Sequence, residues 1–300
     1  MGTVRRVLGL VSGRLAVAIL FVVALLAILG PLVAPHDPLA TSPRTLAGPS
    51  GSHWLGTDNL GRDVFSRLLE GSRTSVVGSV EVALVGLAVG VVPGLLSVYL
   101  GRVFEWVTLR VADTLLALPF LVFAVAVTSL LGNGITQAML TVGVLLSPLF
   151  YRVTRAATLT VAQSQYVESA LISGASVGWV VRRHVWGKVL PPVMVALAYT
   201  VGIGFVVVSS LTFLGIGVQP PAPTWGGLLA SDLGYLSYQP WAPIAPAVLI
   251  IVTVWASNLL ADAIRDVSGE AGRALLNNRR ARAVRATATT EPISAGGATP

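Results

Sequence analysis

The sequence lacks cysteine, has a single lysine and carries few charged side chains. Of its 300 residues, 11% are charged, against about 25% in an ordinary soluble domain. The absence of cysteine excludes disulfides, thiolate nucleophiles and cysteine-based metal sites. The one lysine, Lys188, is followed by Val189, whereas the phosphate-binding loop of a P-loop ATPase needs serine or threonine there. The chain is therefore not itself such an ATPase.

Histidine is also scarce, and its three copies do not form a known catalytic pattern. His36 and His53 lie near Asp37 and Asp58, and His184 lies far along the chain. No HExxH sequence places two histidines on one helical face, as a zinc protease requires. We therefore expect no catalytic residue, no metal ligand and no cofactor in this chain. The alternative is an enzyme that acts within the membrane, such as an intramembrane protease.

Hydrophobic residues make up 54% of the chain and gather in long uncharged runs. A helix needs roughly 20 apolar residues to cross a bilayer. We predict an all-α membrane protein with six transmembrane helices, at about 15–33, 75–100, 114–131, 135–151, 192–216 and 241–261. The first run follows three arginines, as in a signal peptide, but it is longer than the roughly 7 to 15 residues of a signal. We interpret it as a retained span that follows a cytoplasmic segment, 1–14.

The basic residues predict the orientation. If the N-terminus is cytoplasmic, the outer segments hold only Arg44, Arg62, Arg67 and Arg73, and the inner segments hold the other 16 of the 20 basic residues. Such a bias places both termini in the cytoplasm. Basic residues on the inner side would face anionic membrane lipids. The net charge of +7 therefore does not require a nucleic-acid partner.

The connections between the predicted spans are of unequal length. The outer loop 34–73 and the inner loop 152–191 exceed the length of about 15 residues beyond which loops are usually functional, although each could simply cover helix ends. Prolines and aromatic residues in 218–240 favour a rigid outer loop. The tail 268–300 is rich in arginine and then in small residues, so we expect it to be cytoplasmic and largely disordered.

Three long segments resemble one known family. They are HWLGTDNLGRDVFSRLLEGSRTS from His53, YVESALISGASVGWVVRRHVWGKVLPP from Tyr166 and SSLTFLGIGVQPPAPTWGGLL from Ser209. Together with NLLADAIRD from Asn258, they resemble the C-type membrane subunit of dipeptide, oligopeptide and nickel ABC importers. The resemblance covers about 52–268 and implies the type I ABC importer permease fold over 15–267.

The resemblance also implies partners and a location. The chain would pair with a homologous B-type permease subunit in the bacterial cytoplasmic membrane. Two cytoplasmic ATPase domains, which bind ATP and Mg, would lie below the pair, and a solute-binding protein would deliver substrate from outside. Short peptides are the favoured cargo, with nickel chelates, haem and other solutes left open.

The inner segment resembles the EAA loop, with which such subunits dock on the ATPase. The residues that the resemblance assigns to coupling are Glu168, Ser169, Ala170, Gly174 and Pro191. Glu168, near the positive end of the first helix of the loop, would contact the ATPase, with simple helix capping in a solvated loop as the alternative. Gly174 would permit a close backbone approach or a positive φ. Ser169 stands where alanine is usual. Gly187 stands where proline is common, so we expect a looser turn into the fifth span.

Two features lie within the second predicted span. Gly86, Gly90 and Gly94 share one helical face, which favours close helix packing. Glu81 is the only charge well inside a predicted span, and burying it unpaired costs several kcal/mol. We therefore expect a partner or water beside it, with substrate contact or a proton relay as alternatives.

The sequence thus predicts a pore subunit of an ATP-driven importer that does no covalent chemistry. The first rival is a carrier driven by an ion gradient, which would usually show charged relays or broken helices near the mid-membrane. The second rival is a receptor or scaffold that transports nothing.

Overall fold

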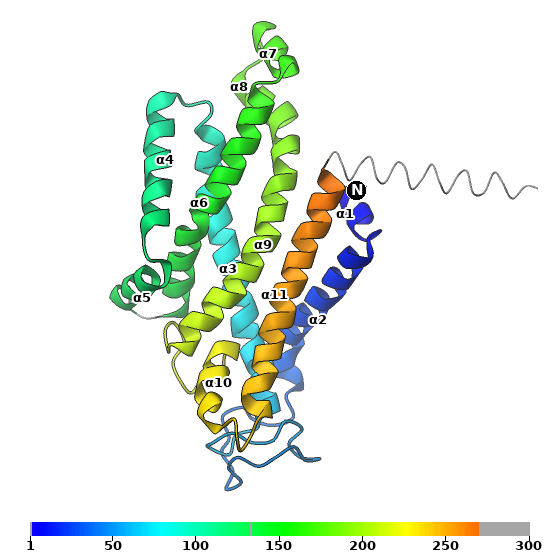
Figure 1. The fold of residues 1–300 in the computed structure, drawn as a ribbon, viewed down its shortest axis with the longest axis vertical. Helices are drawn as coiled ribbons and strands as arrows, with labels where there is room; N and C mark the ends of the chain where they lie inside the picture. The colour runs from blue at the N-terminus through cyan, green and yellow to red at the C-terminus, as the bar shows by residue number, and fades with distance from the viewer. Residues whose placement is uncertain (1, 133, 270–300) are drawn as a thin grey trace, which may run out of the picture.

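The computed structural model describes residues 2–132 and 134–269, which form helices joined by turns and one long loop (Figure 1). The helices are α1 (Gly2–Val7), α2 (Val11–Val33), α3 (Val64–Leu96), α4 (Arg102–Ala117), α5 (Phe120–Leu130), α6 (Ile135–Ala162), α7 (Gln165–Ile172), α8 (Val177–Val180), α9 (Trp186–Phe213), α10 (Trp225–Asp232) and α11 (Trp241–Ser268). A π turn over Val181–Val185 joins α8 to α9, and a 3-10 turn over Leu233–Tyr235 follows α10. The expected all-α architecture is confirmed for this part of the chain.

The number of spans differs from the expected six. Within the described residues, four helical segments are long and apolar enough to cross a membrane, namely α2, α3, Val177–Phe213 and α11. The pair α4 and α5 makes a fifth if it is taken as one broken span. α6 has 28 residues and lies between α3 and α9, but polar residues such as Gln137 and Arg152 lower its hydropathy.

The stretch 114–131, expected as one span, is divided between two helices. α4 and α5 meet at a bend of 98°. Pro119 lies at this bend, and a proline forces the residue before it out of the helical conformation. Leu118 accordingly has φ −73° and ψ 139°.

Other predicted boundaries shift because helices continue past the ends of their apolar runs. α3 begins at Val64 rather than near Ser75, because Asp63 caps it by accepting a hydrogen bond from the Ser66 N–H. α6 continues through Arg152, which pairs with Asp113 at 2.6 Å, and through Arg155, which pairs with Glu105. The expected loop 152–191 is therefore helical at both ends. The tail 268–300 lies almost entirely outside the described residues.

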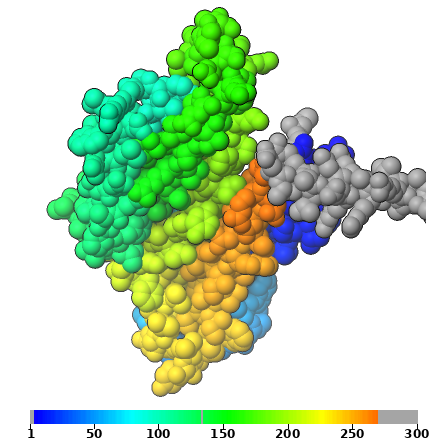
Figure 2. Space-filling model, turned by 45° about the horizontal axis from the view of Figure 1, so that its top comes forward, coloured from blue at the N-terminus to red at the C-terminus, as the bar shows by residue number. Residues whose placement is uncertain are grey.

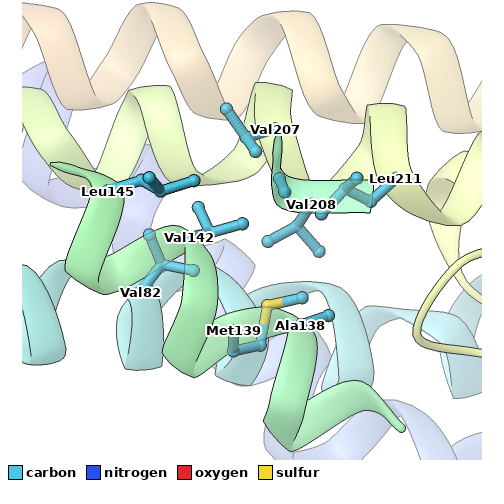
Figure 3. Packing of buried hydrophobic residues seen from close by; sticks show 9 residues of the cluster. Val82, Ala138, Met139, Val142, Leu145, Val207, Val208 and Leu211 are labelled. Atoms are coloured by element: carbon cyan, nitrogen blue, oxygen red, sulfur yellow. The ribbon is translucent and has the colours of Figure 1, made fainter. Parts of the chain in front are cut away.

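α3 is the central helix, and glycine lets it approach α6 closely. A Cβ atom on Gly90 would lie 2.3 Å from the Ser147 carbonyl oxygen, and one on Gly94 would lie 2.8 Å from that of Tyr151. These distances confirm the predicted packing role of the glycine face. Next to this contact, α3, α6 and α9 share an apolar core that includes Val82, Met139, Val142, Val208 and Leu211 (Figure 3).

Candidate functional site

The end of the molecule that carries α7 projects beyond the other helices (Figures 1 and 2). We call Gln165–Val180, which comprises α7, a turn and α8, the α7–α8 unit. Its inward-facing anchor is Val167, which is fully buried and belongs to an apolar cluster that includes Val180 and Val185. The same cluster continues to Val91 on α3 and Val193 on α9. The unit is therefore packed into the same apolar cluster as the spanning helices.

A glycine turn fixes the shape of the unit. Gly174 has φ +88°. Its N–H donates to the Leu171 carbonyl, and the Ala175 N–H donates to the Ala170 carbonyl, both at 3.0 Å. This is the Schellman arrangement, which ends a helix with a residue in the left-handed region. A Cβ on Gly174 would meet nothing within 4 Å. Of the two expectations for Gly174, the structure thus shows the positive φ, and it shows no close backbone approach from residues 2–132 and 134–269.

The outer surface of the unit is unusually apolar. Ile172 is 80% exposed and Trp179 is 51% exposed. With them lie further large exposed apolar side chains, namely Tyr166, Leu171 and Val177. Aromatic contacts of His184 with Tyr166 and Trp179, at 5.8 and 5.2 Å between ring centroids, connect α7 to α8. An exposed apolar surface of this kind is typical of a protein–protein contact.

The remaining residues that the EAA resemblance assigned to coupling fall in two places. Glu168 is exposed in the first turn of α7, and no ion pair of its carboxylate is found within 2–132 and 134–269. Ser169 is exposed and its hydroxyl donates to the Gln165 carbonyl at 2.8 Å, and Ala170 is half-buried against the core. Pro191 lies apart from the unit, inside α9. α9 also passes through Gly187 without a break, so the looser turn expected there is absent.

The turn also contains a motif that sequence reasoning missed. Gly174 to Gly178 reads GASVG, which matches the GxSxG pattern of a serine nucleophile. That motif requires a strand, a sharp turn and a helix. Here Ser176 lies between two helices and caps α8 by accepting a hydrogen bond from the Trp179 N–H. The match is therefore a helix-capping turn.

An open groove of about 1060 Å³ runs between α9 and α11 at the same end of the molecule. Its lining includes Pro191 and Tyr199 from α9 and Asn258 and Asp262 from α11. Basic groups of Arg6, Lys188 and Arg265 also border it. Pro191 thus lines this groove.

Glu81 lies near the middle of α3, on its less buried side. It is half-buried and belongs to a stripe with the exposed residues Val77, Leu84 and Ala88. No hydrogen bond or ion pair reaches its carboxylate from the part of the chain that the structure describes. Because an unpaired carboxylate is costly in lipid, this stripe is better suited to water or another protein than to lipid.

The opposite end of the molecule is formed by the loop 34–63 and α10. α10, a helix within the expected outer loop 218–240, packs tightly against α3 and α9. Trp225 is fully buried, its backbone N–H donates to the Ser75 hydroxyl at 3.0 Å, and its ring stacks on Phe205. The signal that could have revealed this helix is Thr224, which caps it by accepting a hydrogen bond from the Gly227 N–H.

Buried charges fasten the loop 34–63 to the start of α3. Asp58 pairs with Arg62 at 2.7 Å and with Arg67 at 3.5 Å. The Gln239 side chain donates to the carbonyls of Ala47 and Leu55. The loop is therefore a folded cap rather than a free connection.

Asp232, at the end of α10, should make the stability of this cap depend on pH. It is 2% exposed, and burial, reinforced by Asp58 and opposed by Arg67, raises its pKa to about 6 from 3.8. Since the folded state holds this proton more tightly, stability should fall as the pH rises from 3.8 to about 6. Asp232→Asn should remove this pH dependence. Above about pH 6 it should raise the free energy of unfolding by at most about 3 kcal/mol. Thermal unfolding across this pH range measures it.

The control is Asp262→Asn, which changes an exposed carboxylate at the other end of the molecule. It should leave the slope unchanged. An equal slope in Asp232→Asn and the parent chain would contradict the assignment.

Comparisons with known proteins agree with this geometry. Residues 86–270 match the family described as "Binding-protein-dependent transport system inner membrane component". The chain is 37% identical over 219 residues to the glutathione transport system permease protein GsiD of Pectobacterium atrosepticum, covering 73% of each chain. It is 36% identical over 251 residues to the probable D,D-dipeptide transport system permease protein DdpC of Escherichia coli K12, covering 83% of this chain and 84% of that protein.

A solved structure shares the fold. It is an inward-facing conformation of the MetNI methionine ABC transporter, with a TM-score of 0.55 and 18% sequence identity. The match covers 67% of this chain and 96% of that chain. It supports the type I importer arrangement of the helices.

Proposed function

Because the chain belongs to the family of binding-protein-dependent transport system inner membrane components, we propose that it forms half of the pore of an ATP-driven importer for short peptides. It is a multi-pass permease of the bacterial cytoplasmic membrane. The relatives named above are described as permeases of glutathione and D,D-dipeptide transport systems. Both are small peptides, which supports the same class of cargo here.

The observation that carries the proposal is the α7–α8 unit. It exposes apolar side chains such as Ile172 and Trp179, yet Val167 anchors it to helices that cross the membrane. An ATPase that binds this surface can move α6 and α9, and hydrolysis need not occur in this chain. ATP can drive the change only if it favours one arrangement of the pore over the other.

Three surfaces of the molecule suit the proposed partners. A homologous B-type permease subunit completes the pore, and the unpaired Glu81 stripe is suited to face that pore. Two cytoplasmic ATPase domains, which bind ATP and Mg, dock at the α7–α8 unit through a surface that includes Glu168 and Gly174. A solute-binding protein delivers peptide to the end formed by the loop 34–63 and α10.

The orientation is tested with single cysteines, because the parent chain has none. Cysteine at Ser50, in the loop 34–63, should react with an impermeant maleimide in intact cells. Cysteine at Ser176, in the α7–α8 unit, should react only after the membrane is opened. Labelling of position 176 from outside would reverse the proposed orientation.

The function itself is tested by transport in reconstituted vesicles. The chain should co-purify with an ATPase, and uptake of a labelled dipeptide should stop when the ATP site of that partner is inactivated. Dissipating the ion gradients should leave uptake intact. Uptake that follows an ion gradient without ATP would instead support a secondary carrier, and failure to bind any ATPase would support a receptor.

A further inference from the structure

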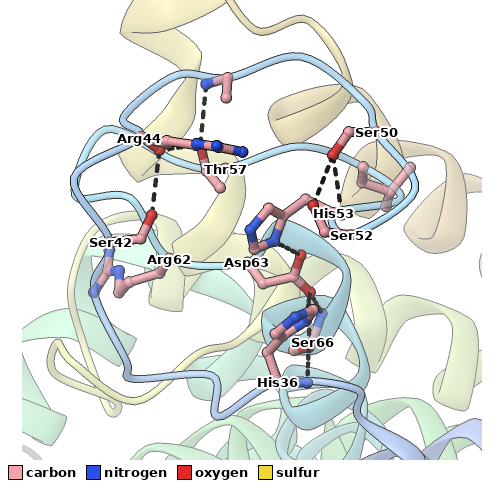
Figure 4. Close-up of polar contacts among 12 residues, drawn as sticks. His36, Ser42, Arg44, Ser50, Ser52, His53, Thr57, Arg62, Asp63 and Ser66 are labelled. Carbon is pink, nitrogen blue, oxygen red and sulfur yellow. Dashed lines mark hydrogen bonds and ion pairs between the residues drawn. The ribbon is translucent and has the colours of Figure 1, made fainter.

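Two of the three histidines come together around one buried carboxylate at the end of the molecule that carries α10 (Figure 4). His36 follows α2, His53 lies within the loop 34–63, and Asp63 caps α3. One potential ligand atom from each of the three lies within 4.8 Å of the other two. In sequence the histidines stand closer to Asp37 and Asp58, so the folded loop changes which carboxylate they meet.

We propose that His36, His53 and Asp63 bind one first-row divalent cation, with Zn²⁺ as the best-suited ion. Two imidazoles and a carboxylate are ligands that zinc accepts. Tetrahedral bonds of about 2.0–2.1 Å place ligand atoms roughly 3.3 Å apart. The Nδ1 of His53 lies 2.8 Å from Oδ1 of Asp63, and the Nδ1 of His36 lies 3.8 Å from Oδ2. The His53 contact is shorter than this spacing, so a cation would widen it. The His36 distance runs to the oxygen that Ser66 holds, so His36 would turn toward Oδ1, starting from an arrangement in which one ligand atom of each residue lies within 4.8 Å of the others.

The carboxylate is held for this role by hydrogen bonds that leave one oxygen available. Oδ2 of Asp63 accepts from the Ser66 N–H at 2.8 Å and from the Ser66 hydroxyl at 2.7 Å. The Ser66 hydroxyl in turn accepts from the backbone N–H of His36 at 3.1 Å. Among the described residues, the one side-chain contact found for Oδ1 is with Nδ1 of His53. A cation would replace that single contact with two bonds, while Ser66 would act as the second-shell support that metal sites use.

The local charge also favours a cation. The Asp63 side chain is 2% exposed, whereas those of His53 and His36 are 17% and 40% exposed. A cation can therefore enter from the histidine side and meet a buried negative charge. Of the nearby charges, Asp58 pairs with both Arg62 and Arg67 and so offsets one of their two positive charges. With three protein ligands, a fourth position stays open for water or a ligand from another molecule.

Binding would join three segments that are distant along the chain. The stretch between His36 and His53 makes up most of the loop 34–63, and Asp63 caps the first turn of α3. A cation at this point would therefore clamp the loop onto α3 and stabilise the folded cap. This inference concerns only the α10 end of the molecule and does not depend on the transported substrate.

The test uses the full chain, purified through a tag that contains no histidine and stripped with EDTA. Zn²⁺ is then titrated by calorimetry and its content is measured after dialysis. We expect one Zn²⁺ per chain and a higher unfolding temperature with Zn²⁺. His36→Ala should weaken binding by more than about 100-fold, beyond the typical loss of a second-shell partner. His36→Cys, which restores a zinc ligand, should recover binding.

The matched control is His184→Ala, which removes the third histidine at the opposite end of the molecule. It should bind Zn²⁺ like the parent chain. His36 is suited to substitution because its side chain is partly exposed, and circular dichroism verifies that His36→Ala stays helical. Absence of saturable binding to the parent, or equal binding by His36→Ala, would overturn the proposal and leave the cluster as a hydrogen-bonded cap of α3 only.

Discussion

Gly90→Leu should prevent the chain from reaching a stable fold. A Cβ at this position would lie 2.3 Å from the Ser147 carbonyl oxygen and 2.7 Å from the Phe150 Cβ. The first of these atoms is backbone, so no side-chain rotation relieves the clash, and α3 must separate from α6. Overpacked cores lose about 1–3 kcal/mol even where side chains can shift, and we expect a larger loss here. The yield of monodisperse protein in detergent and its unfolding temperature measure the effect.

Ala88→Leu is the matched control for this prediction. It adds a larger side chain to the same helix, but on the exposed stripe of α3. The isolated Ala88→Leu chain should fold like the parent. Normal yield and unfolding temperature in Gly90→Leu would show that the close contact between α3 and α6 is not required.

Gly174→Leu should uncouple ATP hydrolysis from uptake while the chain still inserts and folds. The φ of +88° costs a leucine about 1–2 kcal/mol. The turn after α7 can avoid this cost only by changing shape, which moves the exposed apolar surface formed by Leu171 and Ile172. Since about 1.4 kcal/mol corresponds to tenfold in an equilibrium constant, we expect a loss of roughly tenfold in coupled uptake. Peptide-stimulated ATPase activity and uptake are measured in the same vesicles.

Gly178→Leu separates the effect of backbone shape from that of bulk. Gly178 lies in α8 of the same unit, also has open space around it and does not have a positive φ. Its replacement should leave coupling closer to that of the parent. Fully coupled transport in Gly174→Leu, or equal losses in both variants, would contradict the role assigned to the turn.

The sequence predicted those features that depend on periodicity within one helix. Glycines at four-residue spacing share a face, so the common packing face of Gly86, Gly90 and Gly94 followed from their positions, whereas its partner, α6, came from the structure. The positive φ of Gly174 was likewise one of two expected outcomes, because glycine tolerates this region at no steric cost.

Features that depend on contacts between distant residues could not be predicted in this way. The apolar run ends near Tyr151, so hydropathy alone predicts that α6 ends there. The helix continues to Ala162, and the arginines that follow Tyr151 pair with Asp113 and Glu105. α10 was missed because four prolines in 218–240 suggested an irregular loop, whereas Trp225 is held by hydrogen bonds to α3. The meeting of His36 with Asp63 similarly needs the loop 34–63 to fold back on itself.

The uninterrupted helical path from Val177 to Phe213 has a thermodynamic consequence. These 37 residues extend from the α7–α8 unit to the neighbourhood of α10, where Phe205 stacks on Trp225. If docking at Trp179 changes the preferred position of this rod, a ligand at the α10 end that favours one position must change the docking affinity by the same factor. If an ATPase binds at one end and a loaded binding protein at the other, as proposed, linkage requires each to change the affinity of the other by the same factor.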